Sequence, residues 1–147
     1  AYGTLAGFVN PLQSYTDDKL MSDSKLRDYL VQYDFLPSIV EEILSAEDRL
    51  EKFVDAVYWY KRTRASTSLN EFQTVLYLNE VFIEEKLAKE FKWVFKDMES
   101  VLVIRELAEE DGVRSERRES HMKLVDEIRP RLEELAPILR SKFFDRV

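Results

Sequence analysis

The residues that could support metal or nucleophilic chemistry are few, and their spacing suits neither. His121 is the only histidine, and cysteine is absent. A zinc or di-iron site in a helical bundle usually uses Glu-x-x-His pairs, whereas the residue three before His121 is Arg118. Ser120 and Asp126 could complete a Ser-His-Asp arrangement, but only their proximity in sequence supports it. We therefore expect His121 to be a surface or boundary residue, and we predict no metal and no cofactor.

Adjacent carboxylates could act as general acids and bases if they were buried. Here the adjacent pairs fall on the polar side of predicted helices, which favours solvated side chains: Glu84-Glu85, Glu109-Glu110 and Glu133-Glu134. The three glycines cannot form a phosphate-binding loop, because none lies between a strand and a helix. These patterns predict that the chain is not an enzyme.

One cluster has the composition of a binding surface. It lies at the end of a predicted helix and consists of Tyr58, Trp59, Tyr60, Lys61, Arg62 and Arg64. Three consecutive residues point in three directions on a helix, so at least one large aromatic ring should be exposed beside the cations. Aromatic residues and arginine are enriched in protein interfaces, and amphipathic rings beside cations also suit a membrane surface. We predict a protein contact here, with an ordinary bundle end, lipid or nucleic acid as the alternatives.

A second basic cluster lies before His121. Arginines alternate there with glutamates, in the order Arg114, Glu116, Arg117, Arg118 and Glu119. Opposite charges three or four residues apart form ion pairs along one helix face. We therefore interpret this cluster as a helix face with intrahelical ion pairs and not as a binding site.

The composition indicates one folded domain of ordinary size. The 147 residues are 45% apolar and 12% aromatic, which excludes general disorder. The formal charge of −7 disfavours non-specific binding to nucleic acid or to an anionic membrane. No apolar run is long enough to span a bilayer, and no secretory apolar segment is visible.

The elements that must position these residues are helices. From Leu69 to Glu110 apolar residues recur every three or four positions without proline or glycine, which predicts one long helix. Ser68 and Glu71 form a capping box at its start, and Gly112 suits the left-handed position after its end. A second predicted helix begins at a capping box of Ser38 and Glu41.

This second helix should end near Lys61. A heptad-like seam runs along it through Ile43, Ala46, Leu50, Phe53, Val57 and Tyr60. The polar residues 62–67 are expected to reverse the chain, so that the second helix and the long helix form an antiparallel hairpin.

Two shorter patterns complete the helical region. Ser22 or Ser24 can cap a helix with Leu26, Leu30 and Tyr33 on one face, ending before Pro37. The last segment carries an apolar stripe interrupted by two prolines, which predicts a kink or break near Arg129. Its stripe consists of Met122, Val125, Ile128, Leu132, Leu135, Leu139 and Phe143.

Residues 1–21 show neither a helical nor an alternating pattern. We expect an extended N-terminal arm, residues 1–21, that docks its apolar side chains Leu5, Phe8 and Val9 either on the bundle's own end or on a partner chain. Residues 22–147 would form the bundle domain. The predicted fold is all-α: an up-down bundle of three long helices plus one short N-terminal helix, resembling a four-helix bundle. Its predicted core is Leu50, Phe53, Val57, Leu76, Phe91, Val94, Met98, Val125, Leu132 and Leu139.

Around the predicted hairpin the sequence resembles the extrinsic PsbQ family of photosystem II. The matching residues are Ser45-Ala46, Leu50, Phe53-Val54-Asp55, Trp59, Arg62-x-Arg64-Ala65-Ser66 and, after a gap, Thr74-Val75-Leu76. Members of that family are four-helix bundles docked on the lumenal face of the complex. The resemblance therefore implies a non-enzymatic accessory subunit in the thylakoid lumen, without catalytic residues. The proline-rich arm of the plant members is not evident, but an acidic chain starting at Ala1 is compatible with a divergent algal member.

Together these patterns favour an accessory or interaction subunit that docks a helical bundle onto a larger protein complex. Its predicted partners are other protein subunits, with association at the periphery of a membrane complex or with a second copy as alternatives. Nucleic acid is disfavoured by the charge. The alternative function is a regulatory helical module that binds nucleic acid or another helical protein through Tyr58–Arg64. Without the resemblance, we expect a cytoplasmic protein.

Overall fold

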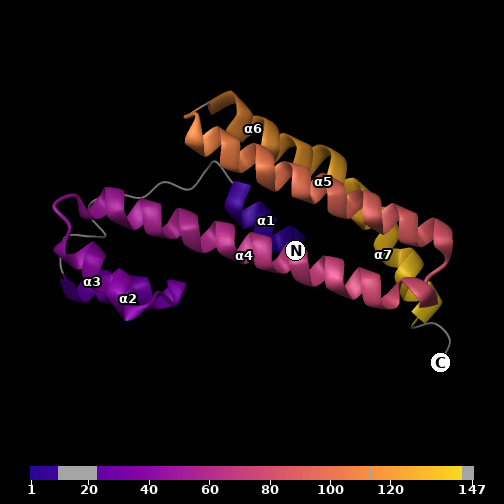
Figure 1. The fold of residues 1–147 in the computed structure, drawn as a ribbon, viewed down its shortest axis with the longest axis horizontal. Coiled ribbons are helices and arrows are strands. Elements are labelled where there is room, and N and C mark those ends of the chain that lie inside the picture. The colour runs from indigo at the N-terminus through magenta and orange to yellow at the C-terminus, as the bar shows by residue number, and fades with distance from the viewer. Residues whose placement is uncertain (10–22, 113, 144–147) are drawn as a thin grey trace. The chain divides into compact units, whose positions relative to one another are not determined.

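The computed structural model describes residues 1–9, 23–112 and 114–143. Within these residues every regular element is a helix, which confirms the all-α prediction (Figure 1). The α-helices are α1 (Tyr2–Val9), α2 (Asp23–Leu30), α3 (Pro37–Ser45), α4 (Arg49–Asn79), α5 (Glu85–Glu110), α6 (Arg114–Lys123) and α7 (Arg129–Phe143). Short 3₁₀ turns η2 (Val31–Tyr33) and η3 (Glu80–Phe82), and the π-helical turn η4 (Leu124–Ile128), connect some of them.

The chain divides into two compact units. Unit 1 comprises residues 1–11 and 65–147, and unit 2 comprises residues 12–64. Helix α4 contributes to both units, since the division falls between Arg64 and Ala65.

The reversal of the chain does not lie where the polar residues predicted it. Residues 62–67 are helical within α4, because arginine, alanine, serine and threonine in that stretch are all tolerated in a helix. Ser68 is therefore inside a helix and caps nothing. The long helix predicted over Leu69–Glu110 instead breaks at residues 80–84, where Ile83 and Glu84 adopt extended backbone conformations.

Asn79 is the last residue of α4 before the break. Its side-chain Nδ2 donates to the Val75 carbonyl, so the side chain occupies an acceptor next to the helix end. After the turn, α5 runs back along the last part of α4. The Phe72 ring contacts the rings of Phe91 and Phe95, with centroid distances of 6.4 and 6.3 Å. The antiparallel hairpin is thus formed by residues 65–79 and α5.

The second predicted helix is also interrupted. Asp48 precedes α4, and its Oδ1 accepts a 2.9 Å hydrogen bond from the Glu51 amide, which is an N-cap. The predicted seam is therefore divided between α3 and α4 at Ala46, which is extended. The Ser38 capping box is wrong as well, because Leu36 is the N-cap and Pro37 occupies the first helical position.

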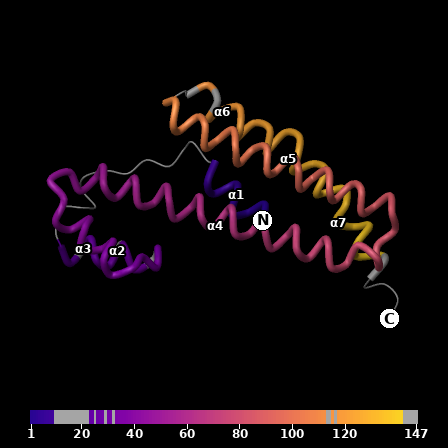
Figure 2. Tube along the Cα trace, in the orientation of Figure 1, coloured from indigo at the N-terminus to yellow at the C-terminus, as the bar shows by residue number. Residues whose placement is uncertain are grey.

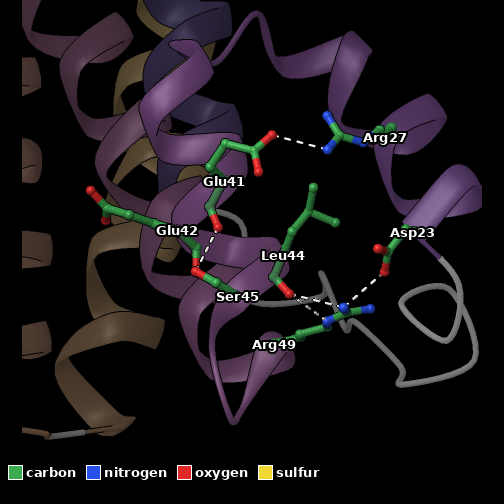
Figure 3. A network of polar contacts seen from close by, with 7 residues as sticks. All are labelled: Asp23, Arg27, Glu41, Glu42, Leu44, Ser45 and Arg49. Carbon is green, nitrogen blue, oxygen red and sulfur yellow. Dashed lines mark hydrogen bonds and ion pairs between the residues drawn. The ribbon is translucent and has the colours of Figure 1, made fainter.

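Unit 2 has a small apolar core and a polar network at its edge. The core consists of Leu26, Leu30, Ile43, Leu44, Phe53 and Val57. Figure 3 shows the network, in which Arg49 donates from Nε and Nη2 to the Leu44 carbonyl at 3.1 and 2.9 Å. The same Arg49 Nη2 lies 2.8 Å from Asp23 Oδ1, so one guanidinium joins the start of α2 to the end of α3. A cation at the last carbonyls of a helix also suits the helix dipole.

The predicted extended arm is wrong where the structure describes it. Tyr2–Val9 is helix α1, which packs against α5 and α6 in unit 1. Leu5, Phe8 and Val9 are all buried. A short helix gains most of its stability from packing an apolar face, so the neighbouring helices and not the local sequence pattern decide its conformation. Residues 10–21 of the predicted arm lie outside the described residues.

The last segment remains helical through its first proline. In η4 the Arg129 amide bonds to the Leu124 carbonyl, five residues back, just before Pro130. The predicted irregularity near Arg129 is therefore a π turn and not a break, and α6 and η4 lie along α5 (Figure 2). The buried positions up to the end of the π turn are Ser120, Leu124 and Ile128, which are spaced four residues apart.

The predicted core is right for six of its members and wrong for four. Phe53, Val57, Leu76, Phe91, Val94 and Met98 are buried. The half-buried ones are Leu50, Val125, Leu132 and Leu139. Of the predicted stripe in the last segment, Ile128 and Leu135 are buried instead, and the side chain of Phe143 lies outside the described residues.

Candidate interaction surfaces

The predicted cluster at the end of the second helix lies in the unit 2 part of α4; we call Tyr58–Arg64 the aromatic–basic cluster. Trp59 is its exposed aromatic residue, with 52% of its surface accessible, as the helical geometry predicted. The Arg62 guanidinium lies over the Trp59 ring at 5.3 Å from the centroid. Tyr58 contacts the Trp59 ring edge-on at 5.4 Å. The indole is thereby held between a cation and a second ring.

The other half of the cluster faces its own unit. Tyr60 packs edge-on against Tyr33 and Phe35, with centroid distances of 5.6 and 5.7 Å. Its hydroxyl accepts a 2.9 Å hydrogen bond from Arg64 Nη1. Burial lowers the pKa of Lys61 from its ordinary value, because desolvation disfavours the ammonium form. Tyr60 therefore packs the cluster against its own unit, and Trp59 is the ring of the cluster that stays exposed to solvent.

The predicted partner-binding residues of the arm are interior residues of unit 1. The Arg105 guanidinium lies 5.2 Å from the Phe8 ring centroid. Arg105 Nη1 is 2.6 Å from Glu109 Oε2, which is also 3.2 Å from Arg117 Nη2. Arg117 thus pairs across to α5, where we had predicted pairs along its own helix; the side chains of Arg114 and Glu116 lie outside the described residues.

A second exposed surface, which the sequence analysis missed, lies in unit 1. We call it the turn patch: Val75, Tyr77, Leu78, Val81 and Phe82, at the end of α4 and in η3. These side chains are between 58% and 83% exposed. Single exposed apolar residues are common on protein surfaces, whereas neighbouring ones of this size are typical of interaction sites. The signal in the sequence was the apolar run Val75–Ile83, which supplies more large side chains than one helix stripe can bury.

A shallow groove of about 530 Å³ lies between α5 and α7. It is bordered by a polar contact in which Arg131 donates from Nε and Nη2 to Glu90 Oε2 at 3.0 and 2.8 Å. The Arg131 guanidinium also stacks on Trp93, 3.6 Å from the ring centroid. Because Arg131 is held by both neighbours, this contact ties α7 to α5.

Several of the residues considered for chemistry have structural partners, but His121 Nδ1 has none among the described residues. The Ser120 hydroxyl is buried and donates to the Arg117 carbonyl at 2.8 Å, and His121 Nδ1 is also buried. Glu85, Glu109 and Glu133 each form an ion pair with a residue four positions away. No group of acids and histidine within the described ranges could hold a metal ion.

Comparisons with known proteins give no relatives. No family model, no curated protein and no solved structure matches the chain. Within the described residues no helix is long and apolar enough to cross a membrane. The PsbQ resemblance therefore stays a prediction from the sequence.

Proposed function

We propose that this chain is a non-enzymatic accessory subunit that docks on a larger protein complex through the aromatic–basic cluster. The observation that carries this proposal is the half-exposed Trp59 ring with the Arg62 guanidinium stacked on it. Tryptophan and arginine are the residues most enriched at energetic centres of protein interfaces. The partner surface that fits is an apolar recess for the indole, bordered by carboxylates for the cations.

The cluster is preorganised for such a contact. Its backbone is the middle of a continuous helix, and Tyr60 holds that helix to the ring pair of Tyr33 and Phe35. The Arg64 guanidinium is in turn held by the Tyr60 hydroxyl. Side chains that are already ordered lose less conformational entropy on binding, which favours affinity.

The charge of the cluster restricts the partner further. Lys61, Arg62 and Arg64 form a local cationic site on a chain whose formal charge is −7. An acidic patch on the partner would attract this end of the molecule and repel most of the remaining surface, which would orient the encounter.

The test is capture of partners by the immobilised full-length chain from an extract of its source at low salt. We expect a stable set of co-purifying proteins, identified by mass, that is lost with Trp59→Ala. The matched control is Trp93→Ala, which removes another arginine-stacked tryptophan, in unit 1. Equal capture by wild type and Trp59→Ala would contradict the proposal, provided circular dichroism shows unchanged helicity.

A salt titration of the same capture separates protein from nucleic acid. Binding through phosphates weakens steeply with salt, because each neutralised phosphate releases counterions. Nuclease treatment that removes the captured material would favour the alternative function, a regulatory module binding nucleic acid through Tyr58–Arg64. We expect capture to survive nuclease.

The PsbQ resemblance gives the proposal a specific form. In that form the assembly is photosystem II, the compartment is the thylakoid lumen, and the described helices belong to an up-down bundle of three long helices and a short one. Recovery of photosystem subunits with the immobilised chain would support this form. Recovery of a different assembly would contradict it and leave the accessory role intact.

A further inference from the structure

The unit 1 part of α4 is unusually poor in charge for a helix with an exposed face. Ser66–Asn79 contains one charged residue, Glu71, in a chain that is 35% charged. One side of this segment buries Leu69 and Leu76. The other side is solvent-exposed, yet it ends in the large side chains of the turn patch. The end of this segment is therefore apolar on both sides, and a helix of that kind is normally covered on both sides.

The side chains on the exposed side differ in size between the first half of the segment and the second. Thr67, Asn70 and Thr74 recur at spacings of three and four, and all are exposed. The next positions of that strip, Leu78 and Val81, belong to the turn patch. Thr74 Oγ1 donates to the Asn70 carbonyl at 2.9 Å, which satisfies the hydroxyl within the helix. The exposed side therefore carries small side chains and Glu71 in its first half and bulky apolar side chains in its second half.

Such a strip is complementary to itself when two copies run antiparallel. A two-fold axis at the level of Leu76 would place Leu78 of each copy opposite Thr74 of the other, Val75 opposite Tyr77, and Val81 opposite Glu71. Asn70 would then lie opposite Phe82. This is the isologous contact expected of a two-fold dimer, in which one patch supplies both sides.

The area is sufficient for a stable contact. The exposed area of the five turn-patch residues amounts to roughly 700 Å² per copy, so two copies would bury at most roughly 1,400 Å², which reaches the standard range for specific interfaces. We propose that the turn patch and the small strip Thr67–Thr74 are a self-association surface, on which a second copy of this chain packs antiparallel. This surface lies in unit 1 and does not depend on the proposed function of the aromatic–basic cluster.

The first test is sedimentation of the full chain over about 1 to 100 μM, a range in which a dimer of moderate affinity dissociates. We expect a monomer–dimer equilibrium. Val81→Asp should raise the dimer dissociation constant by about 100-fold, because it places a second negative charge opposite Glu71 of the other copy in a contact that is otherwise uncharged. The matched control Val103→Asp, on an exposed part of α5, should leave it unchanged. A monomer at all concentrations, or equal effects of both variants, would overturn the proposal.

The second test concerns the antiparallel arrangement. The chain has no cysteine, so introduced cysteines report only on the designed pair. The double variant Asn70→Cys with Phe82→Cys should form a covalent dimer on mild oxidation, whereas each single variant should not. Both positions are on one helical segment and its turn, too far apart to bridge within one chain. A dimer that resists this cross-link would refute the antiparallel packing.

Discussion

The aromatic–basic cluster lies on α4 and the turn patch lies at the end of α4 and in η3, and the two surfaces are built in different ways. In the cluster, Trp59 and Tyr60 each have an arginine over the ring. In the turn patch, no cation lies over the Tyr77 or Phe82 ring within the described residues. The first surface therefore combines apolar area with charge, and the second offers apolar area alone. The difference indicates partners of different chemistry for the two surfaces.

The largest expected effect comes from removing the core beneath each surface. Phe53 is fully buried in unit 2 and Phe91 almost fully in unit 1. Either change to alanine should cost about 3–5 kcal/mol, from lost apolar contacts and the cavity left behind. Urea unfolding followed by circular dichroism measures both.

The two core variants also distinguish the surfaces. Phe53→Ala should weaken capture through the cluster more than it weakens the dimer, and Phe91→Ala should do the reverse. A cost below about 1 kcal/mol for Phe91→Ala would show that the core of unit 1 is placed on the wrong face of α5.

The next largest effect is the difference in stability cost between replacing Tyr60 and replacing Tyr77. Tyr60→Ala removes two ring contacts and the bond from Arg64, and should destabilise the chain by about 2–3 kcal/mol. Tyr77 is 76% exposed, so Tyr77→Ala should change the free energy of unfolding by less than about 0.5 kcal/mol. Equal costs would remove the distinction between an anchored ring and an exposed one.

The dependence on salt concentration should also differ between the two surfaces, with a smaller effect than the substitutions above. Raising sodium chloride from about 0.05 to 0.5 M should weaken capture through the cluster several-fold, because its cations are screened. Dimerisation through the uncharged turn patch should be unchanged or slightly stronger over the same range. Parallel salt series of capture and sedimentation measure both, and identical slopes would count against two different surfaces.

The smallest expected effect is that a rise to alkaline pH changes the stabilities of the two units in opposite directions. Burial raises the pKa of Tyr2 above 10.0, with Arg129 opposing the shift and Glu133 adding to it. Its contribution to stability is complete below pH 10 and is lost as pH rises through the folded-state pKa. The depressed pKa of Lys61, below 10.5, has the opposite sign: its contribution is present above 10.5 and is lost as pH falls through the folded-state pKa.

Between about pH 9 and 11, unit 1 should therefore lose stability while unit 2 gains it. Each unit has one tryptophan, so fluorescence of Trp93→Phe reports on unit 2 and that of Trp59→Phe on unit 1. Tyr2→Phe should remove the loss and Lys61→Met the gain. The same slope in all four variants would show that neither group causes it.

Local sequence rules predicted features that depend on one element. The helical period gave the all-α class, Gly112 does adopt a positive φ of 68° after α5, and helix geometry required an exposed ring at Trp59. The positions at which the helices end were harder to predict. The capping pair Asp48 and Glu51 was present in the sequence and was overlooked, whereas the turn at 80–84 has no proline or glycine to mark it.

The sequence by itself determined that this chain is helical, which residues are apolar enough to be buried, and where aromatic and basic residues concentrate. Only the tertiary structure decided which apolar residues are covered. Leu5, Phe8 and Val9 are buried because α5 and α6 form a face for α1, and Val81 and Phe82 are exposed because the chain turns away after Asn79. Periodicity identifies a face, but burial depends on a neighbouring element that is distant in sequence, and no local pattern encodes that neighbour.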